Sequence, residues 1–595
     1  MKNKSMLLLC AMLAFAFPAR ADAARLPEYP VVIVDSIFFT ADSPCAYAAK
    51  GGSASFLLRY AAGYGFSGCS ADAYTAEQTP EGIRLTINGV NHAQRVSVTS
   101  ARICTDAEEQ RLSVIVYEAN GGQWAQPDEK GGSQYTVSTL LDYHIRPNTD
   151  NGSSLKRRGY TLLGWNIAQD GSGAHIGLGS RADPDTERLW AEWTPWTSAD
   201  EFAYRRKDST IILTGYKGPG DVDTLAIPGS IDGLPVAGIA GSFTTNIPCG
   251  VLRARRLVLP DTLTHIENNA FSAGYFEELF FFDSLADVGQ NAFPNSIRTI
   301  HINAALPPVY QKQNANARFS DNLDRLMMAK GQPKLVFFAG CSMSYGLVSE
   351  MVQEAFPDRT VLNMGVIGGI NARYQMEIIS AFLEAGDVFV HAPEEMSGAQ
   401  LLHDISCDYR MLVTVEGNYD LLALADLSYA DDFWKDYGSY VRMRADETPG
   451  AYTDSSFEYN RFGDILAARP FDEADAPRQD VSRSGGAYVF TDGVLTQRGM
   501  DRLCGIYDSL RDRGVTVLVS YAPVNRDGLP DDGGAAAFEA GFTGALAERG
   551  WSACSSLGDY LLPGRYFYDS DYHLNEGGAL IRTKLLIRDI ANALR

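Results

Sequence analysis

The sequence predicts a multidomain chain in which all-β modules and a short solenoid precede a C-terminal α/β domain with a parallel sheet. The chain has 595 residues, more than one hydrophobic core usually serves, and 45% of them are hydrophobic. Apolar and polar residues alternate over much of the N-terminal half, as in strands with one buried face. From about residue 334, apolar strands alternate with helical stretches, which is typical of a parallel sheet.

Residues 1–23 have the pattern of a secretory signal peptide. Lys2 and Lys4 precede a short apolar run, Met6–Phe17, and small-x-small cleavage sites end at Ala21 and Ala23. A transmembrane helix needs about 20 apolar residues, and neither this run nor any later stretch is long enough. We therefore expect a secreted or cell-surface protein without a transmembrane anchor.

Charge and cysteine content restrict the partners. The net charge is −22, whereas binding to nucleic acid or anionic membranes relies on clustered Lys and Arg, so neither partner is expected. An exported chain can form disulfides, and Cys45 with Cys69 is the pair we expect. The sequence has no Cys-x-x-Cys, which argues against a zinc ribbon. We expect no metal and no cofactor.

Residues 24–108 read as a small β-sandwich-like domain. Short alternating strands are predicted over Val31–Val34, Ser55–Leu58 and Ile83–Ile87, with frequent Gly and Ser between them. No residue pattern in this segment indicates chemistry.

Residues 109–197 carry a second pattern. A strand is predicted over Leu112–Tyr117, and the stretches Arg158–Trp165 and Leu189–Trp193 follow it. The segment resembles the internalin-type B-repeat, a β-grasp-like module of bacterial surface proteins. Its aromatic residues suggest a sugar-stacking platform, but we favour a small core filled by Trp165 and Trp193, because aromatic side chains dominate burial in small domains.

Residues 198–307 contain a repeat of 22 residues. Its apolar positions Leu257, Leu263, Ile266, Ala270 and Phe271 recur as Leu279, Leu285, Val288, Ala292 and Phe293. A fixed period of this length is typical of a solenoid, in which each turn buries its face against its neighbours. The segment resembles BspA-type leucine-rich repeats. We expect a spacer, or weak adhesion to a cell-surface or host protein, and a linker over residues 308–333.

The domain of residues 334–595 carries the chemistry. Strands are predicted over Lys334–Ala339, Thr360–Asn363, Asp387–His391 and Val515–Ser520. Ligands bind beyond the carboxyl ends of such strands. Ser342 follows the first strand, where Gly340 permits a tight turn into a helix. Ser342 is then either a nucleophile beside free helix N–H groups or merely an N-cap, and this turn alone does not separate the two.

A histidine near the C-terminal end of the domain favours the interpretation of Ser342 as a nucleophile over that of an N-cap. The domain contains His391, His403 and His573, and only His573 is flanked by carboxylates and followed by a helix. A His base raises the nucleophilicity of Ser, and a carboxylate holds its tautomer. A lone His beside Asp is often a surface ion pair, but both features in one α/β domain are much less expected by chance.

Three blocks together resemble the SGNH (GDSL-like) hydrolase superfamily. They are the Gly-x-Ser turn, the Asn-Met-Gly-Val-Ile-Gly-Gly loop from Asn363, and the Asp/His element before Leu574-Asn575. The resemblance implies a three-layer α/β/α fold and a Ser-His-Asp triad that hydrolyses esters, often acyl groups on sugars. It also implies the following roles: Ser342 as nucleophile, His573 as base, and Gly368 as oxyanion donor, with Gly369 and Gly365 as alternatives.

The sequence departs from the family pattern in three places. The first block usually reads Gly-Asp-Ser, and here it is Gly340-Cys341-Ser342. Glu394 stands in the block that usually supplies an oxyanion-binding Asn, and an ionised Glu cannot donate a hydrogen bond. Loss of one donor lowers the rate by about 10²–10³. Either Asn371 substitutes, or Glu394 is protonated, or activity is weak. The usual Asp position is Ser570, which leaves Asp569 and Asp571 as candidates; we favour Asp569.

Three functions remain open. The leading one is an exported serine esterase that removes acetyl or acyl groups from a glycan. The second is an O-acyltransferase on the same fold, in which a sugar hydroxyl replaces water. The third is a non-catalytic surface adhesion or scaffold protein with a degenerate hydrolase domain, which the N-terminal repeats support.

Overall fold

The computed structural model describes most of the chain from residue 28 to residue 595. Outside the described part lie residues 1–27, 35, 104–110, 125–133, 142–154, 184, 242, 246–249, 307–308, 310–317, 367–371, 395–408, 426–432, 447–458, 472–494 and 530–532. The predicted signal peptide therefore lies outside the described residues, as do Gly368, Gly369 and Asn371.

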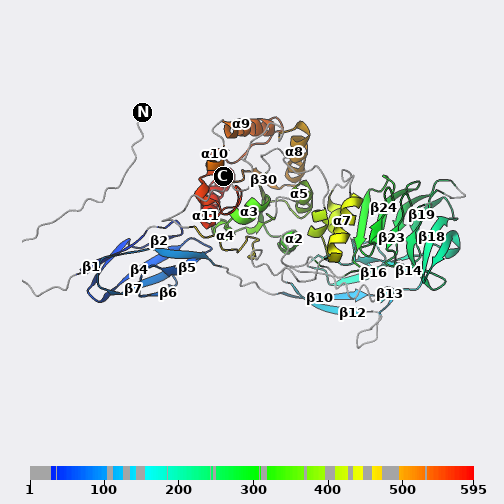
Figure 1. Cartoon of the computed structure of the whole chain (residues 1–595), viewed down its shortest axis with the longest axis horizontal. Coiled ribbons are helices and arrows are strands. Elements are labelled where there is room, and N and C mark those ends of the chain that lie inside the picture. Colours follow the sequence, from blue (N-terminus) through cyan, green and yellow to red (C-terminus); the bar gives the residue numbers. More distant parts are fainter. Residues whose placement is uncertain are drawn as a thin grey trace, which may run out of the picture. The chain divides into compact units, whose positions relative to one another are not determined.

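The described chain forms two compact units (Figure 1). The first comprises residues up to Ala61 together with Gly65–Ser100, and the second comprises Ala62–Tyr64 and Ala101–Arg595. Among the described residues of the first unit, the regular elements are all strands. They are β1 (Glu28–Ile33), β2 (Phe39–Ala41), β3 (Cys45–Ala49), β4 (Gly52–Tyr60), β5 (Tyr64–Cys69), β6 (Tyr74–Thr79), β7 (Gly82–Val90), β8 (Gln94–Val96) and β9 (Val98–Arg102).

The strands of the first unit form a sheet of order β3-β1-β8 and a sheet of order β2-β4-β7-β6. The alternation in the sequence is that of the pleat: Leu85 and Ile87 of β7 are buried, whereas Arg84 and Thr86, which alternate with them, are not. Cys45 and Cys69 are both free thiols. The expected Cys45–Cys69 disulfide is therefore wrong. Both cysteines belong to the same β-rich segment of the sequence, but the sequence does not show whether their Cβ atoms face one another.

The second unit begins with a mixed five-stranded sheet of order β12-β10-β16-β14-β15. Its strands are β10 (Arg111–Glu118), β12 (Gln134–Leu141), β14 (Tyr160–Asn166), β15 (His175–Ile176) and β16 (Arg188–Pro195), beside the pair β11 (Gln123–Trp124) and β13 (Leu155–Lys156). Trp165 is buried and stacks on Trp124 with ring centroids 6.1 Å apart. Trp193 is only partly buried. Trp165 thus belongs to the core, whereas Trp193 retains an accessible face.

The 22-residue repeat corresponds to successive parallel strands that pair in the same register. The main sheet runs β19 (Asp221–Ala226), β22 (Arg253–Val258), β24 (Tyr275–Phe282) and β26 (Thr299–Asn303). Leu257 pairs with Leu279 across this sheet. The rings of Phe271 and Phe293 stack at 5.5 Å, so equivalent repeat positions contact each other directly. The opposite sheet contains β17 (Phe202–Lys207), β18 (Thr210–Tyr216), β21 (Leu234–Ile239), β23 (His265–Ile266) and β25 (Asp287–Val288).

The C-terminal region is an α/β arrangement around a parallel sheet of order β28-β27-β29-β30. Its strands are β27 (Lys334–Phe338), β28 (Thr360–Asn363), β29 (Val388–His391) and β30 (Thr516–Val519), so all four predicted strands are present. Every residue of β27 is buried, which explains its unbroken apolar run. For this strand order, β28-β27-β29-β30, a ligand crevice is expected at the carboxyl ends of β27 and β29.

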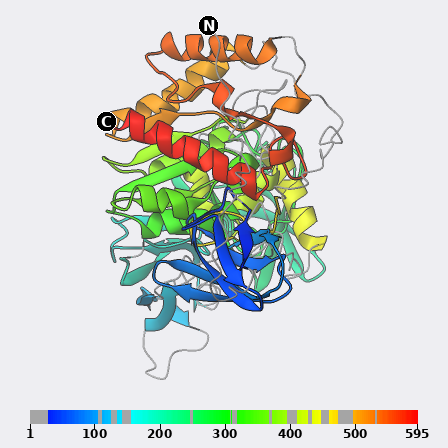
Figure 2. The same cartoon turned by 90° about the vertical axis from the view of Figure 1, so that its left-hand side faces the viewer.

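The C-terminal region also contains helices, of which α7 (Phe433–Asp446) lies beside the repeat strand β24 (Figures 1 and 2). They are α2 (Arg318–Met328), α3 (Cys341–Gly346), α4 (Ser349–Ala355), α5 (Ala372–Ala381), α6 (Tyr409–Thr414), α7 (Phe433–Asp446), α8 (Gln497–Asp512), α9 (Gly534–Ala547), α10 (Leu557–Tyr560) and α11 (Glu576–Ala593). The segment expected to be a linker contains α2, whose Phe319, Leu323 and Leu326 are buried. Their spacing of four and three residues is that of one helix face, which the Pro-Pro and polar residues before it obscured.

Helix α7 packs against the repeat-bearing sheets. The ring of Trp434 stacks on Phe293 at 4.4 Å, and Arg444 forms an ion pair with the buried Asp283 at 2.7 Å. A detached spacer would have neither contact. The repeats are therefore joined to the α/β region through a packed, partly ionic surface.

Candidate active site

Ser342 is the second residue of α3, directly beyond the carboxyl end of β27 (Phe338). Gly340 occupies the N-cap position, with φ −82° and ψ −139°, and has no side chain with which to cap the helix. Ser342 is therefore not an N-cap. It lies within the first turn, where the backbone N–H groups of a helix have no intrahelical partner.

Two buried ionisable side chains hold the backbone of Ser342. Its N–H donates to Glu394 Oε1 at 2.6 Å, and its carbonyl accepts from Arg582 Nη1 at 2.6 Å. Arg582 comes from α11 and is completely buried; this burial lowers its pKa to about 10. The Ser342 hydroxyl is also buried and meets hydrogen-bond geometry with no described residue. It nevertheless lies close enough to the Glu394 carboxyl to lower the pKa of that group.

Glu394 follows β29, so it reaches the crevice from the neighbouring strand. Burial raises the pKa of its carboxyl, and hydrogen bonds from Ser342 and the charges of Arg582 and His573 partly oppose that rise. His573 stacks on Tyr345, and Tyr345 and Ser342 belong to the same short helix α3, so the predicted base and the predicted nucleophile both adjoin α3. The carboxyl also occupies the one N–H of Ser342 that an oxyanion would need.

His573 is oriented by a carboxylate and an aromatic ring. Its Nδ1 lies 2.7 Å from Asp569 Oδ1, and this hydrogen bond lowers the pKa of Asp569. The Tyr345 ring of α3 stacks on the imidazole at 3.9 Å with 7° between the planes. Asp571 instead accepts from Asn525 Nδ2 at 2.9 Å and is buried. The structure thus places Asp569, and not Asp571, against His573.

Gly365, two residues after the end of β28, is the one predicted oxyanion glycine of that loop that lies among the described residues. Its N–H donates to Asn363 Oδ1 at 2.9 Å, and its carbonyl accepts from Ser344 Oγ at 2.6 Å. A Cβ at this position would lie 2.6 Å from Met343 Cβ, so only glycine fits. In this conformation the Gly365 N–H is bonded to Asn363, so it is not available to a ligand.

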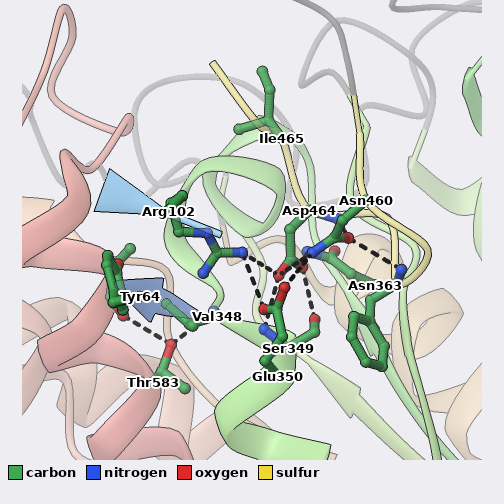
Figure 3. A network of polar contacts seen from close by, with 12 residues as sticks. Tyr64, Arg102, Val348, Ser349, Glu350, Asn363, Asn460, Asp464, Ile465 and Thr583 are labelled. Carbon is green, nitrogen blue, oxygen red and sulfur yellow. Dashed lines mark hydrogen bonds and ion pairs between the residues drawn. The ribbon is translucent and has the colours of Figure 1, made fainter. Parts of the chain in front are cut away.

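A buried polar network that sequence reasoning missed supports this loop (Figure 3). Asn363 Nδ2 donates to Met343 O at 3.1 Å and to Asp464 Oδ1 at 2.9 Å. Asp464 also accepts from Ser349 Oγ at 2.6 Å and pairs with Arg102 at 3.0 Å. Asp464 therefore connects α3, α4, β28 and the end of β9. The sequence carried one local sign of this contact, the glycine that precedes Asp464. In the structure Gly463 has φ +100°, and a Cβ there would lie 2.3 Å from Asn363 O.

Replacing Asp464 by Ala is expected to lower the free energy of unfolding by about 3–5 kcal/mol, because it leaves the buried donors of Ser349 and Asn363 without their acceptor and removes one of the two carboxylates that pair with Arg102. The measurement is the urea midpoint followed by tryptophan fluorescence. Asp512→Ala is the control, since that side chain is 74% exposed, and its midpoint should stay close to wild type. Equal midpoints for the two variants would contradict the role assigned to Asp464.

The remaining predicted groups lie elsewhere. His391 is buried, and its Nδ1 lies 2.6 Å from Tyr507 Oη; burial lowers its pKa to about 3, as expected of a neutral core histidine. His403 lies outside the described residues. Within the described part of the chain, no group of three or more His, Cys, Asp or Glu side chains is placed to hold a metal ion.

Comparisons with known proteins add no name to this arrangement. Neither a scan of the chain against protein-family models nor a search of the curated proteins finds a match. Among the helices that the structure describes, none has both the length and the apolar character required to cross a membrane.

Proposed function

We propose that the protein is an exported or cell-surface serine esterase of the SGNH type that removes acyl groups from a glycan. The observation that carries this proposal is that Ser342 bonds to Glu394, while Tyr345 of the same helix stacks on His573, whose Nδ1 is held by Asp569. The chain segments ahead of it are then an internalin-type B-repeat and BspA-type leucine-rich repeats, which display the enzyme at a surface.

In the proposed reaction, Ser342 Oγ attacks the acyl carbonyl while His573 accepts the hydroxyl proton and then delivers it to the leaving sugar oxygen. Water, deprotonated by His573, next attacks the acyl-enzyme and releases the acid with Ser342 restored. Asp569 holds the imidazole in the tautomer that leaves Nε2 free to accept a proton. No metal enters this scheme.

The conformation described here corresponds to a resting state. The Ser342 hydroxyl is buried, and its N–H is occupied by Glu394. Turnover requires the Ser342 hydroxyl to reach His573 and the substrate oxygen to compete with the Glu394 carboxyl for that N–H. Catalytic hydrogen bonds commonly form only when substrate is bound.

The same contact favours a second function. A carboxylate fixed on the would-be oxyanion donor is the arrangement expected of a hydrolase domain that has lost catalysis and serves surface display or adhesion. In that case the Ser342–Glu394 bond is purely structural.

Labelling with a fluorophosphonate probe separates the two functions. We expect wild type to be labelled and to hydrolyse p-nitrophenyl acetate, Ser342→Ala to lose both, and His573→Ala to lose at least about 10²-fold in rate. Ser439→Ala, an exposed serine on α7, and His265→Ala, which removes another His–Asp pair at 2.9 Å, are matched controls that should keep full activity. No labelling and no hydrolysis by folded wild type would leave surface display as the function. Hydrolysis that depends on an added sugar acceptor would indicate an O-acyltransferase.

A further inference from the structure

A cavity of about 610 Å³ lies between the mixed sheet and the parallel-strand repeats, well apart in sequence from the catalytic residues. One wall comes from β13, β14 and β16, and the other from residues around Gly229, Pro260 and Phe282. The two modules are packed together at this point, because Leu163 of β14 contacts Ala226, Val258 and Phe280 of the repeats (Figure 1). The volume is that of a typical small-ligand site.

Aromatic rings with fixed orientations line this cavity. Trp193 Nε1 donates to Ala119 O at 2.9 Å, and Trp196 Nε1 donates to Thr161 Oγ1 at 2.9 Å. Both tryptophans and Tyr160 remain partly exposed. Because the Nε1–H group of each indole already donates a hydrogen bond within the protein, a ligand can contact only the face of the ring. A flat apolar face of this kind suits the C–H face of a pyranose ring.

Three consecutive cations stand beside these rings. Lys156 pairs with Asp261 at 2.8 Å, and the Arg157 guanidinium lies 3.7 Å from the centre of the Tyr160 ring. Among the described residues, neither Arg157 nor Arg158 forms an ion pair with a carboxylate. The chain has a net charge of −22, yet of these three cations only Lys156 has a carboxylate partner among the described residues. A guanidinium binds a carboxylate through two parallel hydrogen bonds.

We propose that this cavity binds an acidic oligosaccharide, with sugar rings on Trp193 and Trp196 and a sugar carboxylate on Arg157 and Arg158. The site is separate from the proposed esterase centre and would hold a glycan at the surface whether or not Ser342 is catalytic. Rings and cations together distinguish this ligand from a neutral glycan, which lacks the charge, and from a polyphosphate, which lacks the ring.

Calorimetric titration of the full chain tests this proposal, and it is done with Ser342→Ala so that no ester is cleaved. The probes are tetragalacturonic acid, its methyl ester with the same rings and no charge, and inorganic tripolyphosphate. We expect tetragalacturonic acid to bind at least tenfold more tightly than either comparator. Trp196→Ala and the double variant Arg157→Ala/Arg158→Ala should each weaken it at least tenfold.

Matched controls are available in the same part of the chain. Trp190→Ala removes a tryptophan of β16 that does not line the cavity, and Arg205→Ala/Arg206→Ala removes a neighbouring arginine pair on β17; neither should change the affinity. Absence of binding by the folded chain would overturn the proposal, as would affinity that the cavity variants leave unchanged. Equal affinity for the methyl ester or for tripolyphosphate would also overturn it. If Trp196→Ala fails to fold, the arginine variant decides the outcome.

Discussion

Asparagine in place of Asp569 is expected to lower ester hydrolysis by about 10²–10⁴-fold, whereas the same change at Asp571 should leave the rate within a few-fold of wild type. Asp569 accepts the hydrogen bond of His573 Nδ1 at 2.7 Å, so it holds the proton on Nδ1 and leaves Nε2 as the base. An Asn amide can donate to Nδ1 and thereby favour the wrong tautomer. Asp571 lacks this contact because it is bonded to Asn525.

The two variants should also differ in stability, and in the opposite order. The Asp569 side chain is 50% exposed, so its replacement should change the free energy of unfolding by less than about 1 kcal/mol. Asp571 is buried, and its loss as an acceptor should cost about 1–3 kcal/mol. The measurements are hydrolysis rate, probe labelling and thermal midpoint on each variant. A rate loss in Asp571→Asn as large as that in Asp569→Asn would contradict the assignment.

Glutamine in place of Glu394 is expected to raise the rate of ester hydrolysis at pH 8 by about 10²-fold, the usual worth of one oxyanion donor. The Glu394 carboxyl occupies the Ser342 N–H at 2.6 Å, and in its ionised form it would repel a developing oxyanion. A Gln amide of the same shape can still accept that N–H through its oxygen, while its NH₂ group can donate to the oxyanion.

The pH dependence provides an independent check on Glu394. Burial raises the pKa of its carboxyl, so the protonated, donor-capable form persists to higher pH than for an exposed Glu. The wild-type rate, relative to that of Glu394→Gln, should therefore be greatest below this raised pKa and fall as the pH rises through it. The measurement is a pH–rate profile of both proteins, with Glu548→Gln, an exposed residue that follows α9, as control. A variant no faster than wild type at any pH would show that Glu394 does not limit turnover.

Glu394 has a parallel effect on stability. A carboxyl with a raised pKa in the folded state binds its proton more tightly there than in the unfolded chain, so stability decreases as pH rises from the unfolded pKa through the folded one. Glu394→Gln should lose this decrease. The comparison requires only thermal midpoints across pH, and it holds even if the domain proves to have no activity.

The sequence by itself determined the strands of the parallel sheet, the position of Ser342 beyond the first of them and the 22-residue repeat. Each depends on periodicity within a short window or on a fixed spacing along the chain, as with Leu257 and Leu279. It also marked His573 through neighbours only a few residues away.

Only the tertiary structure decided what these residues touch. The bond from Glu394 to Ser342 spans 52 residues, that from Asp464 to Asn363 spans 101, and that from Arg582 to Ser342 spans 240. The pairing of His573 with Asp569 depends on a local turn that directs Asp571 toward Asn525. Side-chain direction and contacts between distant segments follow from packing of the whole core, and no local pattern carries that information.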